Sequence, residues 1–281
     1  MSKIRICADS TCDLSSELLS RYDIDIVPLS VTLGDFTGRD GMEVTPAKIY
    51  QHVAECKELP KTSAVNTEEY VRVFRSWREK GYSIVHYCIS SEFSSCYQNA
   101  CAAAEEFPNV YVVDSRNLST GHGHVVLEAA RLAAEGLAPE EIVRRLEELT
   151  ARVDASFILE HLEYMKKGGR CSAVALLGAN LLKLRPCIEV ANGKMGVAKK
   201  YRGTFAKCLE TYIADRLEGR TDLDPRMIFI THSGVPDEII ALAQQTIAKY
   251  QTFEELCVTR AGCTVSSHCG PGTIGILFIR K

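Results

Sequence analysis

Hydroxyl, thiol and imidazole side chains in a few short segments could perform chemistry in this 281-residue chain. Ser94 and Cys96 lie in the run SSEFSSC at 90–96, and His268 precedes the turn Gly270-Pro271-Gly272. A serine or cysteine nucleophile with a histidine base would give an esterase or thioesterase. The sequence has no Gly-x-Ser-x-Gly elbow, which argues against one hydrolase family and leaves other nucleophile arrangements open.

The hydroxyls of Thr62 and Ser94 suit a structural role equally well. Threonine and serine routinely cap turns and helix starts by accepting a backbone N–H. Asp9-Ser10-Thr11 follows an apolar run and is typical of an Asx turn that leads into a helix. Residue types alone therefore favour capping over ligand contact at these positions.

Arg170 and His268 are the charged or titratable groups whose surroundings point to a ligand. Arg170 follows Gly168-Gly169, so a flexible backbone could present its guanidinium at a pocket mouth, where planar donors suit a carboxyl or phosphoryl group. The rigid turn after His268 could hold the imidazole near a ligand, although a lone histidine is commonly structural.

Metal binding is not expected. His122 and His124 have no third ligand nearby in the sequence. The chain has 12 cysteines, no Cys-x-x-Cys pair, and even steps between Cys257, Cys263 and Cys269 that match no common zinc spacing. Many cysteines lie in apolar runs and should behave as small, reduced hydrophobes.

Charge and composition exclude several classes of protein. The 33 Lys and Arg against 36 Asp and Glu give a net charge of −3, without the basic excess that nucleic-acid binding needs. Neither a Walker loop nor a Gly-x-Gly-x-x-Gly fingerprint follows a predicted strand, so ATP should belong to another protein. No signal-peptide core or transmembrane-length apolar run occurs, so we expect a cytoplasmic protein without stable membrane insertion.

Strand-like and helix-like patterns alternate through the first half of the chain and must position these side chains. Apolar, β-branched runs at 4–8, 25–33, 82–89 and 110–113 alternate with helical patterns at 15–22, 45–56, 67–80, 94–106, 123–136 and 139–153. This alternation predicts a doubly wound, largely parallel sheet whose ligands bind at the carboxyl ends of the strands.

The second half predicts a smaller α/β unit with a mixed sheet. Strand-like runs at 187–190 and 196–200 meet at Asn192-Gly193, which is a strong hairpin signal. A strand at 228–230, a helix at 237–250 and a strand at 273–279 follow. An apolar stretch around 173–184 would either lie in a core or line a tunnel. We therefore predict an α/β fold with domains at 1–155 and 156–281.

Five separated segments resemble the DegV family of fatty-acid-binding proteins. Their order and spacing span residues 4–279, which makes the set specific although each segment is short. One departure is Ser95-Cys96, where the family usually has glycine and threonine. The segments are Asp9-Ser10-Thr11, Lys61-Thr62-Ser63, residues 90–98, Lys167-Gly168-Gly169-Arg170 and residues 268–272.

The resemblance implies a carrier rather than an enzyme. It implies one long-chain fatty acid, such as a C16 or C18 acid, enclosed between the two domains, and no cofactor. It also implies a separate ATP-dependent kinase subunit that forms the acyl phosphate. Thr62 and Ser94 would hold the carboxyl group, with Ser63, Ser95 and His268 beside them. Arg170 and Arg202 would contact the phosphoryl group or the partner subunit.

Most of the affinity for such a ligand would come from its tail. Burial of about 14 methylenes at roughly 0.8 kcal/mol each gives an upper bound near ~11 kcal/mol before ordering costs. The carboxyl group would be costly to bury unless hydroxyl and backbone N–H groups meet it.

Overall fold

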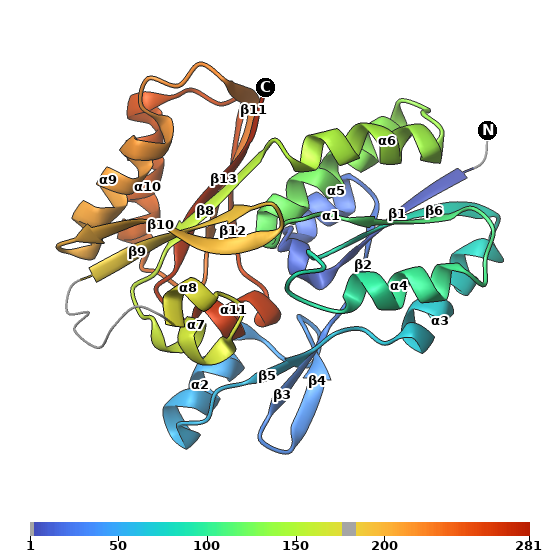
Figure 1. The fold of residues 1–281 in the computed structure, drawn as a ribbon, viewed down its shortest axis with the longest axis horizontal. Coiled ribbons are helices and arrows are strands. Elements are labelled where there is room, and N and C mark those ends of the chain that lie inside the picture. The colour runs from blue at the N-terminus through green and yellow to red at the C-terminus, as the bar shows by residue number, and fades with distance from the viewer. Residues whose placement is uncertain (1–2, 176–183) are drawn as a thin grey trace.

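The computed structural model describes residues 3–175 and 184–281. Figure 1 shows two sheets side by side, the one from the first half of the chain on the right and the one from the second half on the left. A third, smaller sheet lies below them.

The first sheet is parallel, in the order β2-β1-β6-β7. Both of its faces are covered by apolar side chains, because Cys7 belongs to one core cluster while Ile6 and Ala8 belong to another. Burial on both faces explains why these strands read as continuous apolar runs. The strands are β1 (Lys3–Asp9), β2 (Ile24–Val27), β6 (Tyr82–Cys88) and β7 (Val110–Asp114).

Helices cover the parallel sheet on its two faces. Tyr70 and Ala100 pack in one core from α3 (Thr67–Arg78) and α4 (Cys96–Ala104). Leu18, Val125 and Leu146 pack in the other from α1 (Ser16–Arg21), α5 (Ser119–Ala134) and α6 (Pro139–Thr150). A short 3-10 turn, η1 (Ser10–Cys12), links β1 to the loop before α1.

Helix α5 lies between the two large sheets and is bonded to both. His122 Nε2 lies 3.1 Å from the backbone oxygen of Tyr87 on β6, and His124 Nε2 lies 3.0 Å from that of Leu277 in the second sheet. Burial lowers the pKa of each imidazole to about 4, so both are neutral at pH 7. These two histidines join the halves of the molecule.

The second sheet is mixed, in the order β10-β9-β8-β13-β11-β12, with only β11 and β12 parallel among the described strands. The predicted hairpin is confirmed, because Asn192 and Gly193 turn with φ of 52° and 81° between β9 and β10. The strands are β8 (Val153–Ile158), β9 (Leu184–Ala191), β10 (Lys194–Arg202), β11 (Leu223–His232), β12 (Glu255–Arg260) and β13 (Ile274–Arg280).

Helices α9 (Phe205–Leu217) and α10 (Asp237–Tyr250) cover one face of the mixed sheet, on the left of Figure 1. Three short helices lie nearer the first half: α7 (Glu163–Gly168), α8 (Ser172–Ala175) and α11 (Cys263–Cys269). The apolar stretch predicted at 173–184 begins in α8, and its residues 176–183 lie outside the described residues.

A small antiparallel sheet, β4-β3-β5, corrects one prediction about the first half. The run at 25–33 is two strands rather than one, because Pro28 and Leu29 separate β2 from β3 (Ser30–Leu33) and β3 turns back into the small sheet. Strands β4 (Phe36–Arg39) and β5 (Lys61–Ser63) flank β3, and α2 (Pro46–Cys56) packs against α11.

The predicted α/β fold, with a parallel sheet followed by a mixed sheet, is confirmed. The domain boundary at 155/156 falls within β8 and stays a prediction. No described helix is both long and apolar enough to cross a membrane.

Candidate functional site

A mainly apolar cavity of about 60 Å³ lies between the two halves of the chain. The carboxyl ends of the parallel strands contribute Ile89 and Phe93, α7 contributes Met165, and β10 contributes Met195. The cavity therefore forms at the edge where ligands bind in doubly wound sheets. Its polar lining residues are Thr62, Ser63, Ser94, Arg170, Thr264 and His268.

Thr62 and His268 meet directly at this cavity. Oγ1 of Thr62 on β5 lies 2.8 Å from Nε2 of His268 on α11, across 206 positions of sequence. Burial, and then the positive charge of Arg170, lowers the pKa of His268 to about 4. A neutral imidazole with its proton on Nε2 donates to Thr62 Oγ1 and leaves the threonine hydroxyl proton free for a ligand.

Two polar atoms at the cavity have no hydrogen-bond partner among the described residues. They are the hydroxyl oxygen of Thr264 and Nδ1 of His268, both buried. Buried polar groups in native proteins are nearly always paired, and an unpaired one calls for an explanation such as a bound molecule. The two atoms mark the α11 side of the cavity as its polar end.

Ser94 lies on the loop between β6 and α4 and lines the same cavity. Its hydroxyl donates to Sγ of Cys96 at 3.2 Å and accepts from the Cys96 backbone N–H at 3.3 Å. Ser94 thus bonds the first N–H of α4, although the N-cap position is Ser95, whose side chain makes no capping hydrogen bond. A thiol is a weak acceptor, so the hydroxyl proton can be redirected to an anionic ligand at little cost.

The loop after α7 closes the cavity beside His268. Arg170 lines the cavity and donates from Nη1 to the Gly168 carbonyl at 2.9 Å. Gly168 is required here, since a Cβ at this position would lie 2.6 Å from Nδ1 of His268. Ser63 lies at the rim and is exposed.

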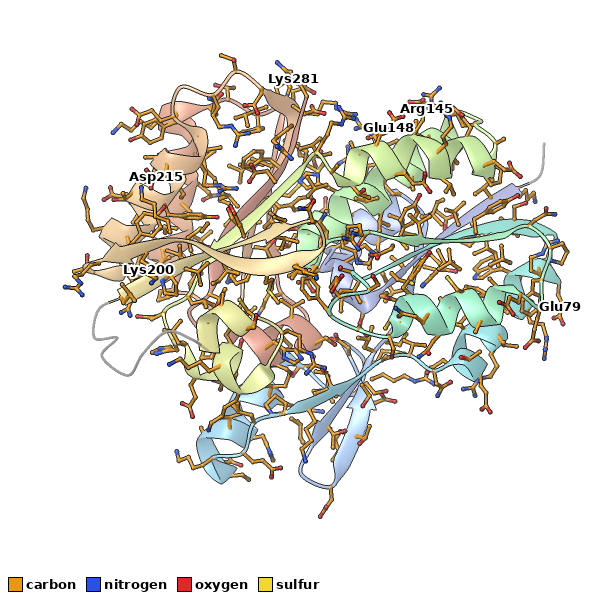
Figure 2. The ribbon with its side chains drawn as sticks, in the orientation of Figure 1. Glu79, Arg145, Glu148, Lys200, Asp215 and Lys281 are labelled. Atoms are coloured by element: carbon orange, nitrogen blue, oxygen red, sulfur yellow. The ribbon has the colours of Figure 1, made fainter. Side chains whose placement is uncertain are left out.

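Ser95 and Arg202 do not line the cavity. Ser95 is exposed at the N-cap of α4, and Arg202 is exposed at the end of β10. On the surface near Arg202, Lys199 forms an ion pair of 2.6 Å with Asp215 of α9. Figure 2 shows Lys200 and Asp215 at this periphery of the molecule. Arg202 is therefore a surface residue outside the cavity lining, and its role as a partner or phosphoryl contact stays a prediction.

The turn of the β9–β10 hairpin docks on the loop that carries Ser94. Ser90 Oγ donates to the Gly193 carbonyl at 2.8 Å, and Arg116 donates to the Asn192 carbonyl. A Cβ on Gly193 would lie 2.8–2.9 Å from Arg116 and Ser90, so glycine permits this approach. The hairpin thereby holds Met195 over the cavity.

Buried polar groups under the parallel sheet support the same loop. The Asp9 carboxylate accepts from Tyr70 at 2.6 Å, from the Ile89 backbone N–H at 3.0 Å, and contacts His86 Nε2 at 3.2 Å. Burial opposes ionisation, but the hydrogen bonds from His86 and Tyr70 lower the pKa of Asp9 overall. Asp9, His86 and Cys88 lie close enough to hold a metal ion, yet hydrogen bonds already occupy the carboxylate.

A second cavity of about 30 Å³ adjoins the first. Leu118, Val265 and Cys269 line both, and the second extends towards Val190 of β9 and Gly275 of β13. The two cavities together point from the Thr62–His268 pair into the space between the sheets.

A larger open groove of about 530 Å³ lies beside Asp154 and Arg216, away from these residues. Three of its four lining arginines form ion pairs: Arg216 with Asp154 and Glu189, Arg220 with Asp154 at 2.9 Å, and Arg116 with Asp114 at 3.8 Å. The fourth, Arg280, donates to backbone carbonyls. This groove is a solvated ion-pair surface, and the smaller apolar cavity has the chemistry of a binding site.

The geometry does not support the nucleophile hypothesis. No hydrogen bond joins Ser94 or Cys96 to His268 in the described parts of the chain. Burial raises the pKa of the Cys96 thiol to about 12, which keeps it protonated and weakly nucleophilic. An imidazole with a pKa of about 4 is also a weak base at pH 7.

Sequence patterns missed several residues that build the cavity. Thr264, Met165 and Met195 line it without belonging to any motif. Asp13 and Asp40, which hold α11, also gave no signal, because their partners are backbone N–H groups far away in sequence. A glycine pair such as Gly168-Gly169 was the detectable sign of a close approach.

Comparisons with known proteins agree on one family. A family model described as an uncharacterised protein of the DegV family matches residues 3–281. A DegV family structure from Thermus thermophilus, reported for its fatty acid binding, is 35% identical with a TM-score of 0.90 over 100% of both chains. A stearic acid-binding protein from Eubacterium ventriosum is 28% identical with a TM-score of 0.84, covering 100% of this chain and 99% of that one. The fatty acid-binding protein of Thermotoga maritima is 30% identical over 97% of this chain and 96% of its own length.

Proposed function

The chain belongs to the DegV family, and on that premise we propose that it binds one long-chain fatty acid, with the carboxyl group held by the Thr62 and Ser94 hydroxyls. The observation that carries this proposal is the Thr62–His268 hydrogen bond at the polar end of an apolar cavity. Solved relatives reported to bind fatty acids share the fold over the whole chain.

The carboxyl group would be met by donors that the protein already orients. His268 fixes Thr62, whose proton turns to one carboxylate oxygen, while Ser94 exchanges its weak bond to Cys96 for the other. Ser63 and Thr264 offer further hydroxyls at the same end. The positive charge of Arg170 near the rim favours the ionised acid. Ser95, outside the lining, would act through the start of α4.

The acyl tail would occupy the apolar cavity and its neighbour. Their volumes of about 60 and 30 Å³ are far below the roughly 300 Å³ or more of ordinary ligand pockets, so binding requires side chains to move. Met165 and Met195 suit this role, because methionine is flexible and fills irregular space. Leu118 lines both cavities and would be the next group to be displaced.

We propose further that a separate ATP-dependent kinase subunit acts on the bound acid. In that reaction a carboxylate oxygen attacks the terminal phosphorus of ATP, the bond to ADP breaks, and an acyl phosphate forms. Arg170 at the rim and Arg202 at the end of β10 are the guanidinium groups that would meet the phosphoryl group or the partner. The chain itself would act as carrier.

The first test is to extract the purified protein with mild organic solvent and identify the released molecule by mass spectrometry. The proposal expects a long-chain fatty acid close to one per chain. Protein that releases none, and that takes up no stearic acid when titrated, would contradict it.

Thr62→Val and Ser94→Ala locate the carboxyl site. Each removes one donor of a charge-assisted hydrogen bond, worth about 1.5–3 kcal/mol, so affinity for stearic acid should fall by tenfold or more. Thr37→Val, an exposed threonine on β4, is the matched control. Hydrolysis of model esters by wild type, abolished in Ser94→Ala, would instead favour the esterase reading.

A further inference from the structure

Two carboxyl groups from the first half of the chain accept hydrogen bonds from the N-terminal end of α11. Asp40, just after β4, accepts the backbone N–H groups of Cys263 at 2.7 Å and Thr264 at 2.9 Å, and the Ser10 hydroxyl at 3.1 Å. The first N–H groups of a helix have no acceptor within the helix, and the Asp40 carboxylate supplies one for two of them.

Asp13 holds the residue before the helix. Its carboxyl group accepts the Gly262 N–H at 2.8 Å and the Ser119 hydroxyl at 2.6 Å. A Cβ on Gly262 would lie 3.0 Å from Oδ1 of Asp13 and 3.3 Å from Oδ1 of Asp40. The two carboxyl groups therefore close around one backbone position, and both residues are buried.

Polar groups near both ends of the same helix line the cavity. His268 bonds Thr62 on β5, and Thr264 and Cys269 line the cavity from α11. The small sheet thus contacts α11 at both ends, through Asp40 beyond β4 and through Thr62 on β5. In Figure 1, α11 lies between the mixed sheet and the small sheet. A shift at the Asp40 end would move the imidazole at the other end.

We propose that Asp40 and Asp13 are positioning residues that set α11, and with it Thr264 and His268, for the carboxyl group of the ligand. This inference rests on the proposed function, and neither aspartate touches the ligand itself. The two residues act through helix placement, in the way that outer groups orient the residues of a site.

Asp13 also holds a proton near neutral pH. Burial, with the negative charge of Asp40, raises the pKa of Asp13 to about 8 despite its two hydrogen bonds. The charged group that faces Asp13 is Asp40, and the other titratable neighbours are the thiols of Cys12, Cys263 and Cys269.

A double-mutant cycle tests the proposal by stearic acid affinity. Asp40→Asn turns one acceptor oxygen into an NH₂ group that faces a backbone N–H, so affinity should fall about tenfold. When His268 is already Gln, Asp40→Asn should change affinity less than twofold, because Asp40 acts on the ligand through the His268 imidazole. Equal losses in both backgrounds would show a general structural effect and overturn the proposal. Asp35→Asn, on the exposed β3–β4 turn, is the matched control.

The imidazole of His268 gives a readout that needs no ligand. NMR resonances of the ring, assigned with His268→Gln, should shift in Asp40→Asn and stay in place in Asp35→Asn. Unchanged resonances in Asp40→Asn would reject the positioning role whether or not the protein binds fatty acid. If the resonances shift but wild type binds no acid, the proposed function fails and the helix anchor stands.

Asp13→Asn tests whether the Asp13 carboxyl group holds a proton near neutral pH. The folded pKa near 8 lies above the unfolded value of about 3.9, so the folded state binds the extra proton between about pH 4 and 8 and loses stability as pH rises through that window. Asparagine cannot ionise, so the variant should become steadily more stable relative to wild type from pH 5 to pH 8 in urea unfolding. If the difference in unfolding free energy between the variant and wild type stays constant from pH 5 to pH 8, Asp13 holds no such proton.

Discussion

Single residues at the cavity combine a neutral imidazole with hydroxyl donors. His268 bonds Thr62, and its pKa of about 4 means that it carries no charge at pH 7. In the proposed complex, recognition of the carboxylate would depend on hydrogen-bond donors and on the nearby charge of Arg170, and not on a charged His268. Low pH should therefore disrupt the site, because protonation would place a positive charge on the buried His268 ring.

His268→Gln should reduce the acid sensitivity of the protein. The pKa of His268 is about 4 in the folded state, below the value of about 6.5 in the unfolded state. The unfolded state therefore takes up a proton first, and the free energy of unfolding falls as pH drops from 6.5 towards 4. Between pH 6.5 and 5 the loss is about 2 kcal/mol. Urea unfolding of the variant should show a correspondingly smaller decline over this range. His161→Gln, an exposed histidine, should decline like wild type.

The elements that build the site are short helices packed against one another. Helix α7 ends at Gly168, where its backbone approaches the His268 ring on α11. A side chain at this contact would push the two helices apart. The glycine is therefore a packing requirement of the site rather than a source of flexibility.

Gly168→Ala should weaken fatty acid binding by tenfold or more while leaving the fold intact. Its Cβ would lie 2.6 Å from Nδ1 of His268 and displace the ring, whereas alanine in a helix is favoured over glycine by about 1 kcal/mol. Titration with stearic acid, alongside thermal unfolding, separates the two effects. Gly196→Ala on β10 meets nothing within 4 Å and should bind normally. Normal binding by Gly168→Ala would mean that His268 is not needed.

Elements with strong apolar patterns could be predicted from the sequence, and those made by tertiary contacts could not. The parallel strands are apolar on both faces, so β1 and β6 were evident. Helix α11 was missed, because it has only seven residues and its polar side chains are buried, so its sequence shows no apolar stripe. The small sheet was missed since its strands are short and half exposed.

The residues of the candidate site also divide into those that the sequence could indicate and those that only tertiary contacts define. Thr62, Ser94 and His268 came from the family resemblance, since each residue type alone favoured a structural role. The structure brings these three to one cavity, and their part in binding stays a prediction. Asp13 and Asp40 could not be found from sequence, because a carboxylate that binds distant backbone N–H groups leaves no local pattern.

At the scale of the whole molecule, the cavity lies between parts contributed by both halves of the chain. A ligand bound there would contact β5 and the β6–α4 loop on one side and α7, β10 and α11 on the other. Because binding requires both halves to be folded, it should stabilise them as one unit.

Stearic acid should therefore raise the unfolding temperature of the whole protein in a single transition. At 100 times the dissociation constant the added stability is about 2.7 kcal/mol, or several degrees. Thermal unfolding followed by circular dichroism measures the rise. Thr62→Val at the same ligand concentration should show a smaller rise. Stabilisation of only one of two separate transitions would place the ligand within one half.

The order of strands in the mixed sheet has a consequence for biosynthesis. β13 lies at its centre, between β8 and β11, yet it follows the other five strands in sequence. During translation, β8, β9 and β10 emerge first and must wait, with an unpaired edge on β8, until β13 inserts. Helix α11 emerges just before β13, so the nascent chain completes its sheet and its binding cavity in the same late step.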